Sequence, residues 1–350
     1  MPRILGAAHA FPIHRVSQQQ ARQAASTIFA GKIPELKRLL TIFDNSRIAQ
    51  RQLVMPLDWY LKPRSLEERN QIFVDQGMSL LREAAEKVLR SSDADVSQVA
   101  HVIYVNSTGH ATPSLDARLI NEMNLSVQTT RLPIWGLGCA GGAAGLSRAR
   151  DYCLAHPTAK VLLTALECCS LTLVVEDLSK KNLVGTSLFS DGAAAVLVAG
   201  DEASGSGPEI VATRSQLFPD SYDIMGWNFS DQGMELVLSP RLPLLIKKEL
   251  PGMVDRFLSD YGLARADLQH YIAHPGGAKV LDAISEALDL RDEELHLSEE
   301  LLNRQGNVSS VSVLVVLEDW LKSKASSIDE YGLLFAFGPG FSAELILIKV

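Results

Sequence analysis

Hydrophobic residues follow two alternating patterns along the chain. A nearly continuous apolar run, typical of a strand buried on both faces, covers 99–105, and further strands are predicted at 160–166 and 193–198. Elsewhere apolar residues recur every three or four positions, as in amphipathic helices, most extensively over 65–89. Further strands are predicted at 4–11, 130–135, 208–215, 268–273, 332–337 and 343–349, and further helices at 17–29, 33–43, 116–124, 143–153, 242–261, 278–288, 297–302 and 309–321. This alternation predicts an α/β fold.

Three segments lack either pattern. Residues 46–63 are mixed and typical of a surface connection, 174–182 are charge-rich and predicted to form a loop, and 218–231 are rich in turn residues. After the last of these, the order of strands and helices is repeated more compactly. The sequence therefore predicts a duplicated unit, with one half at residues 1–215 and the other at residues 216–350.

Composition narrows the possible functions. With 350 residues, 47% of them hydrophobic, the chain can bury one large core or two smaller ones. Its net charge of −8 argues against non-specific binding to nucleic acid or to an anionic membrane. An anionic ligand would therefore need a local basic patch. No apolar run is long enough to span a membrane, and the N-terminus lacks the hydrophobic region of a signal peptide.

The cysteines indicate a reducing compartment. Cys139, Cys153, Cys168 and Cys169 show no paired spacing of metal ligands, and the adjacent Cys168 and Cys169 seldom bridge to each other. We therefore expect a cytoplasmic protein without a metal site. Cys168 and Cys169 are interpreted as packing or cavity-wall residues, with packing favoured.

Cys139 is the first candidate for chemistry. It lies among glycines and alanines in 136–145, after one predicted strand and before a helix. Free backbone N–H groups and the helix dipole at such a turn favour a thiolate, which can ionise near neutral pH and attack an acyl carbon. The same glycines match a dinucleotide-binding fingerprint, with Glu167 as its acidic partner. A third interpretation is a buried packing cysteine.

Two polar residues of the second half occupy comparable places. His274 follows a predicted strand, and Asn307 precedes the helix at 309–321. Each alone fits a structural role, His274 as a hydrogen-bonded core histidine and Asn307 as a helix N-cap. Sites in α/β sheets form beyond the carboxyl ends of strands, where both residues can meet Cys139. Together the three supply a base, an oxyanion donor and a nucleophile.

Five motifs extend this constellation over nearly the whole chain. They are Gly138-Cys139-Ala140-Gly141-Gly142, Leu188-Phe189-Ser190-Asp191-Gly192-Ala193-Ala194, His274-Pro275-Gly276-Gly277, Gly306-Asn307-Val308-Ser309-Ser310 and Phe337-Gly338-Pro339-Gly340-Phe341. In this order they resemble the motifs of type III polyketide synthases, the chalcone-synthase-like branch of the thiolase-fold condensing enzymes. The N-terminal region is most similar to bacterial enzymes that make alkylpyrones, notably at 51–54 and 56–60.

The resemblance implies a fold, substrates and catalytic roles. It implies a thiolase-like fold of two duplicated βαβαβ-type halves in α-β-α-β-α layers, assembled as a homodimer. An acyl-CoA starter and malonyl-CoA would be the substrates, with no carrier protein, metal or other cofactor required. Cys139 matches the acyl-carrying nucleophile. His274 and Asn307 match the pair that promotes malonyl decarboxylation and holds the enolate oxygen.

The resemblance also implies how the cavity is lined. Phe189 matches one of two phenylalanines between the coenzyme A tunnel and the cavity, whereas the second position falls near Leu236, where this chain departs from the family. Thr172 and Ser309 match cavity-shaping positions. The loop Gly338-Pro339-Gly340 matches the one that scaffolds cyclisation.

Two features bear on substrate binding. Of the family's basic contacts to coenzyme A, only Arg38 aligns well, so the other phosphate-binding cations stay open. The segment 236–238, with Leu242 and Leu244 downstream, could line an aliphatic channel or belong to the ordinary core. With the likeness to alkylpyrone-forming enzymes, it predicts a medium- or long-chain fatty acyl-CoA starter and alkylpyrone or alkylresorcinol products.

Related enzymes are the nearest alternatives. A fatty-acid-initiation ketosynthase matches at Cys139 and Asn307, but it usually carries His-Gln-Ala-Asn where this chain has His-Pro-Gly-Gly. A ketoacyl-CoA synthase that condenses only once is harder to exclude. The non-enzyme alternative is a catalytically silent thiolase-fold subunit, against which the intact Cys139, His274 and Asn307 argue.

Overall fold

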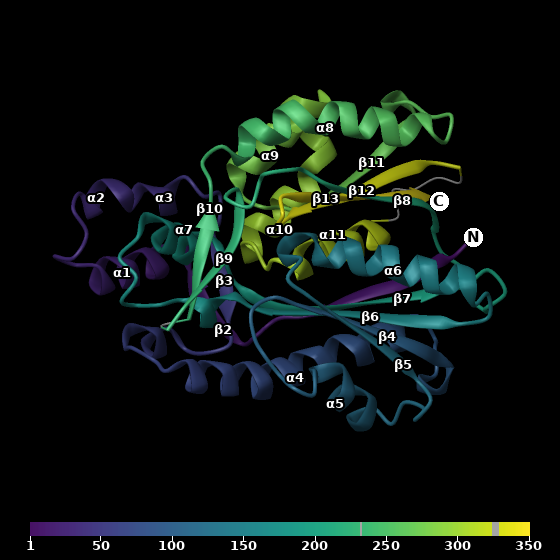
Figure 1. Ribbon diagram of the computed structural model, residues 1–350, viewed down its shortest axis with the longest axis horizontal. Coiled ribbons are helices and arrows are strands. Elements are labelled where there is room, and N and C mark those ends of the chain that lie inside the picture. The colour runs from purple at the N-terminus through teal and green to yellow at the C-terminus, as the bar shows by residue number, and fades with distance from the viewer. Residues whose placement is uncertain (232, 324–328) are drawn as a thin grey trace.

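A nine-stranded sheet organises the molecule in the computed structural model, which describes residues 1–231, 233–323 and 329–350 (Figure 1). Its strands, in the order β11-β12-β13-β8-β1-β7-β6-β4-β5, are β1 (Arg3–Ala10), β4 (Val99–Asn106), β5 (Thr130–Trp135), β6 (Lys160–Cys168), β7 (Asp191–Ala199), β8 (Glu209–Leu217), β11 (Leu268–Ala273), β12 (Tyr331–Gly338) and β13 (Ser342–Lys349). β4 runs parallel to β5 and β6. β1 pairs with β7 along its length but meets β8 only at Arg3, so the sheet has two parts.

Helices form layers around these two parts (Figure 1). They are α1 (Gln18–Ile28), α2 (Leu36–Leu39), α3 (Thr41–Asp44), α4 (Leu66–Ser91), α5 (Leu115–Glu122), α6 (Gly141–Ala155), α7 (Lys180–Leu188), α8 (Leu242–Ser259), α9 (Ala278–Leu288), α10 (His296–Gln305) and α11 (Ser310–Lys322). α6 and α11 lie between the two parts of the sheet, α4 and α5 cover one outer face, and α8 and α9 cover the other. This is the predicted α-β-α-β-α layering.

The two central helices approach each other closely at their first turns. A Cβ atom at Gly142 of α6 would lie 2.2 Å from the carbonyl oxygen of Ser310, the first residue of α11. Only glycine permits this approach. The contact therefore brings the segment before α11 against the turn before α6, which are the two places where the sequence puts Asn307 and Cys139.

The predicted strands of the main sheet and the long helices are confirmed, but three short segments differ from expectation. The helix expected at 33–43 is two single turns, α2 and α3, because α2 buries no side chain that could hold a longer helix in place. The loop expected at 174–182 already contains the start of α7. The turn-rich segment 218–231 contains β9 (Met225–Ser230), which forms a hairpin with β10 (Gly233–Leu238).

One further hairpin was not expected, β2 (His14–Ser17) with β3 (Gln50–Leu53). It lies beside α7 and β9–β10 on the side of the molecule that carries α1 to α3 (Figure 1). Within the described residues, no helix is both long and apolar enough to cross a membrane. The division of the chain at 215/216 stays a prediction.

Candidate active site

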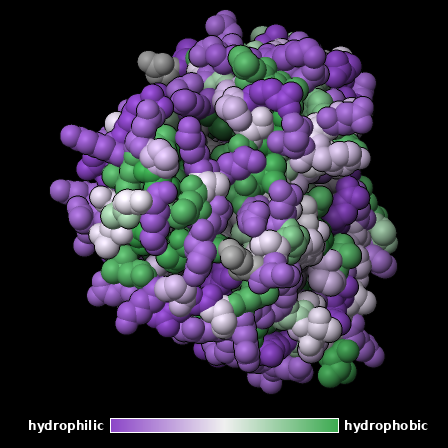
Figure 2. Space-filling model, turned by 60° about the vertical axis from the view of Figure 1, so that its left-hand side comes forward, coloured by the Kyte–Doolittle hydropathy of each residue, from purple (hydrophilic) through white to green (hydrophobic). Residues whose placement is uncertain are grey.

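A cavity of about 720 Å³ is lined by residues from both halves of the chain. Cys139 precedes α6, His274 follows β11 and Asn307 precedes α11, and all three line this cavity. The structure thus brings together the three residues singled out in the sequence. The side of the molecule that carries α1 to α3 is hollowed, with hydrophobic residues visible between polar ones (Figure 2).

Cys139 sits in a 3₁₀ turn between β5 and α6. Gly138 has φ 47°, and a Cβ atom there would lie 2.8 Å from Cδ of Pro339, so glycine permits both the turn and the close approach of the neighbouring loop. The cysteine is only 7% exposed, and its Sγ atom lies 3.7 Å from Oγ of Ser309. Cys139 is therefore a buried thiol that faces the cavity at a helix start.

His274 presents a buried ring without partners. Its backbone N–H donates to the carbonyl of Phe335 in β12 at 3.0 Å, which fixes the residue at the end of β11. Among the described residues, neither ring nitrogen has a hydrogen-bond partner, although His274 is only 4% exposed. Buried polar atoms are almost always paired, so we expect this ring to form a hydrogen bond with a substrate in the cavity that it lines. The alternative of a hydrogen-bonded core histidine is wrong.

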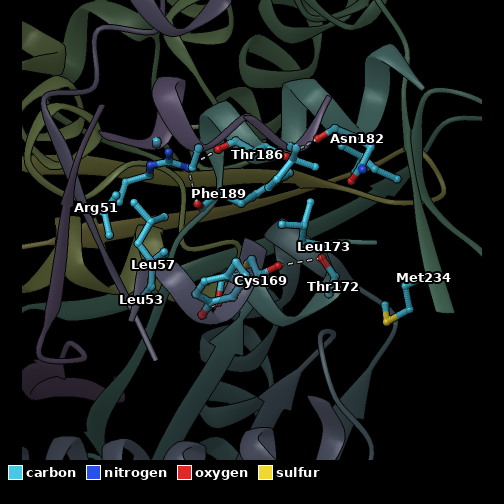
Figure 3. Close-up of a pocket in the computed structure, with 18 of the residues that line it drawn as sticks. Arg51, Leu53, Leu57, Cys169, Thr172, Leu173, Asn182, Thr186, Phe189 and Met234 are labelled. Atoms are coloured by element: carbon cyan, nitrogen blue, oxygen red, sulfur yellow. Dashed lines mark hydrogen bonds between the residues drawn. The ribbon is translucent and has the colours of Figure 1, made fainter. Parts of the chain in front are cut away.

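The backbone of Asn307 is fixed to the end of α7. Its N–H donates to the carbonyl of Leu188 at 3.0 Å, and its carbonyl accepts from Ser190 at 2.9 Å. These two bonds form a parallel bridge between Asn307 and Phe189. Arg51 of β3 braces the same segment, because its guanidinium donates to the carbonyls of Thr186 and Phe189 at 2.6 and 3.0 Å (Figure 3).

The carboxamide of Asn307 is also oriented. Its Oδ1 atom accepts from the backbone N–H of Ser309 at 2.7 Å, and its Nδ2 atom donates to the carbonyl of Gly276 at 3.2 Å. α11 begins at Ser310 with Ser309 as its N-cap, so the alternative of Asn307 as the N-cap is wrong. The amide group carries a second N–H, which is the donor that the cavity can use.

Burial keeps the thiol and the imidazole neutral. It raises the pKa of Cys139 to about 12, against the opposing effect of hydrogen bonds from Ser309 and Asn307, and it lowers the pKa of His274 to about 3. Burial of the thiol thus opposes the ionisation that the helix start alone was expected to favour. A thiolate can form only when a proton acceptor in the cavity takes the proton, and His274 is the available base.

Glu167 has a structural role. Its side chain is fully buried and accepts hydrogen bonds from the hydroxyls of Ser107, Thr108 and Ser310 at 2.6 to 2.8 Å. Burial raises the pKa of this carboxyl, and the same hydrogen bonds oppose the shift. Glu167 thus ties the ends of β4 and β6 to the first turn of α11. It cannot reach a ribose from there, so the dinucleotide interpretation is wrong.

A second, smaller cavity of about 70 Å³ adjoins the first and is shown in Figure 3. Phe189, Leu236, Trp227 and Cys169 line both cavities and so form the partition between them. Apart from this partition, one part of the small cavity is lined by aliphatic side chains and another part by polar ones. The aliphatic residues are Val16, Ala21, Ala24, Ile28, Leu53, Leu57 and Leu173, and the polar ones are Arg51, Tyr60, Ser170, Thr172, Asn182 and Thr186. Its outer wall comes from α1, β3 and the turn after β3.

The remaining predicted cavity residues fall into different places. Pro339, Ser309 and Leu236 line the large cavity, and Thr172 lines the small one, where its hydroxyl donates to the carbonyl of Cys169 at 2.7 Å. Gly338 and Gly340 do not line either cavity. A Cβ atom at Gly338 would lie 2.4 Å from the carbonyl oxygen of Leu137, so this glycine packs the loop against the Cys139 turn. Arg38 lines the large cavity but already pairs with Glu35 at 2.7 Å.

Several expectations about the channel need correction. Leu238 and Leu242 line the large cavity, but Leu244 is 68% exposed and lines neither cavity. Cys169 is a cavity-wall residue, whereas a role in packing was favoured from the sequence.

Sequence reasoning missed Trp227 and the lysines Lys180, Lys181 and Lys279, all of which line the large cavity. Alternation across the β9–β10 hairpin, which places Trp227 opposite Leu236, was the signal that could have revealed Trp227.

Comparison with known proteins decides the family. Residues 4–202 match the model for the N-terminal domain of chalcone and stilbene synthases, and residues 209–350 match the model for their C-terminal domain. The chain belongs to the chalcone and stilbene synthase family. Within this family it is 36% identical to 1,3,6,8-tetrahydroxynaphthalene synthase of Streptomyces peucetius, over 97% of this chain and 91% of that one. It is 41% identical to a protein of Bacillus subtilis (strain 168) whose name proposes a chalcone synthase, over 99% and 98%.

Solved structures agree with this assignment. The crystal structure of 1,3,6,8-tetrahydroxynaphthalene synthase from Streptomyces coelicolor, a bacterial type III polyketide synthase, superposes with a TM-score of 0.94 at 30% identity and covers 99% of each chain. A fungal type III polyketide synthase superposes with a TM-score of 0.90 at 27% identity, again over 99% of each chain. The protein is therefore a type III polyketide synthase with a thiolase-like fold, and it transfers acyl groups in condensation reactions.

Proposed function

We propose that this type III polyketide synthase condenses malonyl-CoA onto a medium- or long-chain fatty acyl-CoA and closes the product to an alkylpyrone or alkylresorcinol. Neither a carrier protein nor a metal ion or other cofactor takes part in the proposed reaction. The observation that carries the choice of starter is the row of aliphatic residues that lines part of the small cavity, next to Phe189 and Leu236. All four cysteines are unpaired, which fits the proposed cytoplasmic location.

Loading of the starter begins with proton transfer from Cys139 to His274. The sulfur then forms a bond to the acyl carbon of the thioester, and the bond from that carbon to the sulfur of coenzyme A breaks. His274 returns its proton to the departing thiolate. Burial favours the neutral forms of both residues, so the thiolate and the protonated imidazole exist only during this step.

Extension begins with malonyl-CoA in the same cavity. Its carbon–carbon bond to carbon dioxide breaks, and the electron pair passes into an enolate whose oxygen accepts hydrogen bonds from the neutral His274 ring and from Nδ2 of Asn307. The enolate carbon attacks the acyl carbon on Cys139, and the sulfur leaves as a new β-ketoacyl-CoA forms. That product can reload Cys139 for another round.

Narrowing the partition should shorten the preferred starter. Leu236→Trp places a larger side chain between the two cavities and is expected to raise the KM of the longest fatty acyl-CoA by at least about tenfold, since each excluded methylene forfeits about 0.8 kcal/mol. KM across a series of acyl-CoA lengths, with products identified by mass spectrometry, measures this. Leu244→Trp is the matched control, because Leu244 is 68% exposed.

Two outcomes would contradict the proposed starter. One is better turnover of an aromatic starter, such as a hydroxycinnamoyl-CoA, than of every fatty acyl-CoA by the wild-type enzyme. The other is product formation from malonyl-CoA alone. Products of a single condensation would favour the alternative of a ketoacyl-CoA synthase.

We also propose that the enzyme is a homodimer joined at β5. This edge strand pairs with β4 on one side, and its residues are almost all exposed. At its end, the ring of Trp135 lies 5.6 Å from His110 and 6.0 Å from Phe229, measured between centroids. A second copy can pair antiparallel with β5 and cover this aromatic cluster.

Charges on β5 should therefore break the dimer. The double variant Leu132→Lys, Trp135→Glu is expected to elute as a monomer in size-exclusion chromatography with light scattering, while Leu154→Lys, which changes an equally exposed leucine on α6, leaves the mass unchanged. A double variant with the mass of the wild type would show that β5 is not the interface.

A further inference from the structure

Arg51 is a cation buried between the small cavity and the backbone that leads into Asn307. It lies on β3, is only 4% exposed and lines the small cavity. Burial lowers the pKa of Arg51 to about 10, against the opposing effect of the charge of Asp191, so the guanidinium stays protonated at neutral pH. A buried charge is costly unless it is paired and hydrogen-bonded, so the contacts of this side chain indicate its role.

The guanidinium of Arg51 holds the segment on one side of Asn307. Its Nη1 atom donates to the carbonyls of Thr186 and Phe189 at 2.6 and 3.0 Å, whereas its Nε atom has no partner within the described residues (Figure 3). The two residues that flank Phe189 are the ones bonded to the backbone of Asn307. The hydrogen bonds of this buried cation are therefore spent on the segment against which Asn307 is fixed.

The aliphatic part of Arg51 packs against the other side. A Cβ atom at Gly306, the residue before Asn307, would lie 3.0 Å from both Cγ and Cδ of Arg51. Gly306 also has φ 73°, which a residue with a side chain adopts only under strain. The arginine therefore contacts the peptide that leads into Asn307 directly. One side chain thus holds both segments that set the position of Asn307.

Asp191 fixes the strand that carries Arg51. Its carboxylate accepts from the backbone N–H groups of Val54, just after β3, and of Ser170, each at 2.8 Å, and from the hydroxyl of Ser170. Its backbone carbonyl accepts from Nε2 of Gln305, the last residue of α10, at 3.2 Å. The end of β3, the start of β7 and the end of α10 are thus joined through one residue.

We propose that Arg51 is a positioning residue for the decarboxylation of malonyl-CoA, because it holds Asn307 where the carboxamide donates to the enolate oxygen. The inference rests on the proposed function, since it requires decarboxylation at this site. An oxyanion donor acts only within a narrow range of positions, and a displacement of about 1 Å can slow a reaction about 10²-fold. Loss of the guanidinium frees the carbonyls at 186 and 189, and the segment 306–307 moves with them.

Loading of the starter should not depend on Arg51. Within the part of the chain that the structure describes, its hydrogen bonds go to the segment 186–189 and none goes to Cys139 or His274. A role in positioning Asn307 therefore predicts a selective defect, in which extension fails while the acyl-enzyme still forms.

Decarboxylation and loading measured in the same variants test this role. Arg51→Met is expected to release carbon dioxide from radiolabelled malonyl-CoA about 10²-fold more slowly, yet to load the starter within about threefold of the wild-type rate, as intact-protein mass spectrometry shows. Arg51→Lys keeps the charge but not the forked guanidinium, so its loss should be smaller. Arg15→Met, which changes an exposed arginine on β2 of the same hairpin, should alter neither rate.

A double-mutant cycle shows whether Arg51 acts through Asn307. Asn307→Ala removes the donor, so adding Arg51→Met to it should slow decarboxylation by less than about threefold more. Independent roles would multiply, and a further loss of about 10²-fold in the double variant would overturn the proposal.

Chemical rescue guards against a variant that is merely misfolded. Arg51→Ala leaves space beside the small cavity, and millimolar N-ethylguanidinium should restore part of its decarboxylation but none of that of Asn307→Ala. Equal losses of loading and decarboxylation in both Arg51→Met and Arg51→Lys, without rescue of Arg51→Ala, would show a general structural role and contradict the assignment.

The wild-type enzyme separates this inference from the proposed function. If the wild type releases no carbon dioxide from malonyl-CoA, the proposed function is wrong and the inference falls with it. If the wild type decarboxylates malonyl-CoA and Arg51→Met does so equally fast, only the role of Arg51 is wrong.

Discussion

Cys139→Ala is expected to abolish polyketide formation, with a fall in turnover of at least about 10³-fold. Of the two cysteines that line the cavity, only Cys139 lies at the turn before α6, so removal of its sulfur is expected to leave no atom to carry the acyl chain. The fold should survive, because deletion of one buried sulfur costs about 1 kcal/mol of the free energy of unfolding. Intact-protein mass spectrometry after incubation with the starter acyl-CoA measures the acyl-enzyme directly.

Cys169→Ala is the matched control for this experiment. Cys169 is buried, lines the same cavity and has a pKa that burial raises, but it belongs to the partition rather than to the turn at α6. The Cys169→Ala variant should still become acylated at Cys139, and at most the chain lengths of its products should change. Covalent trapping of the starter in Cys139→Ala would refute the assignment of the nucleophile.

Asn307→Ala is expected to separate loading from extension. Asn307 is not needed as the base for Cys139, but its Nδ2 atom is held where it can donate to an enolate oxygen. The variant should still load a starter, yet release carbon dioxide from malonyl-CoA about 10²- to 10³-fold more slowly, which is the usual cost of one oxyanion donor. Radiolabelled malonyl-CoA reports the decarboxylation.

His274→Ala supplies the comparison, because loss of the base should impair both loading and decarboxylation. Asn121→Ala, which removes an exposed carboxamide on α5, should impair neither. Normal decarboxylation in Asn307→Ala would remove this residue from the chemistry. Equal loss of loading in the Asn307 and His274 variants would show that the two roles cannot be separated.

Most of the fold could be predicted from the sequence because its central strands are covered on both faces. β4, β6 and β7 are buried along nearly their whole length and are therefore predominantly apolar in sequence. β9 escaped prediction because its residues are exposed or half-buried and include Asn228 and Ser230. Its strand conformation comes from pairing with β10, which local composition does not encode.

Only those residues of the site that lie in short sequence motifs could be predicted. Cys139, His274 and Asn307 each lie at an element boundary marked by glycines or small residues, and these boundaries meet in the fold. Lys180 and Lys279 have no such signal, because a cavity wall is assembled from distant segments. The charge states of Cys139 and His274 also depend on burial, which the sequence pattern at a helix start does not reveal.

The bridge between Phe189 and Asn307 links the choice of starter to the rate of turnover. Phe189 lies in the proposed partition, and Asn307 supplies the proposed hydrogen bond to the reacting oxygen. The backbone of Asn307 is bonded to Leu188 and Ser190, the two residues that flank Phe189. A substitution that shifts the peptide at 189 to admit a bulkier starter will also move the carboxamide at 307. Laboratory evolution toward new products should thus find its early gains in selectivity accompanied by slower turnover, with compensating changes arising at Arg51, which braces the shared segment from outside.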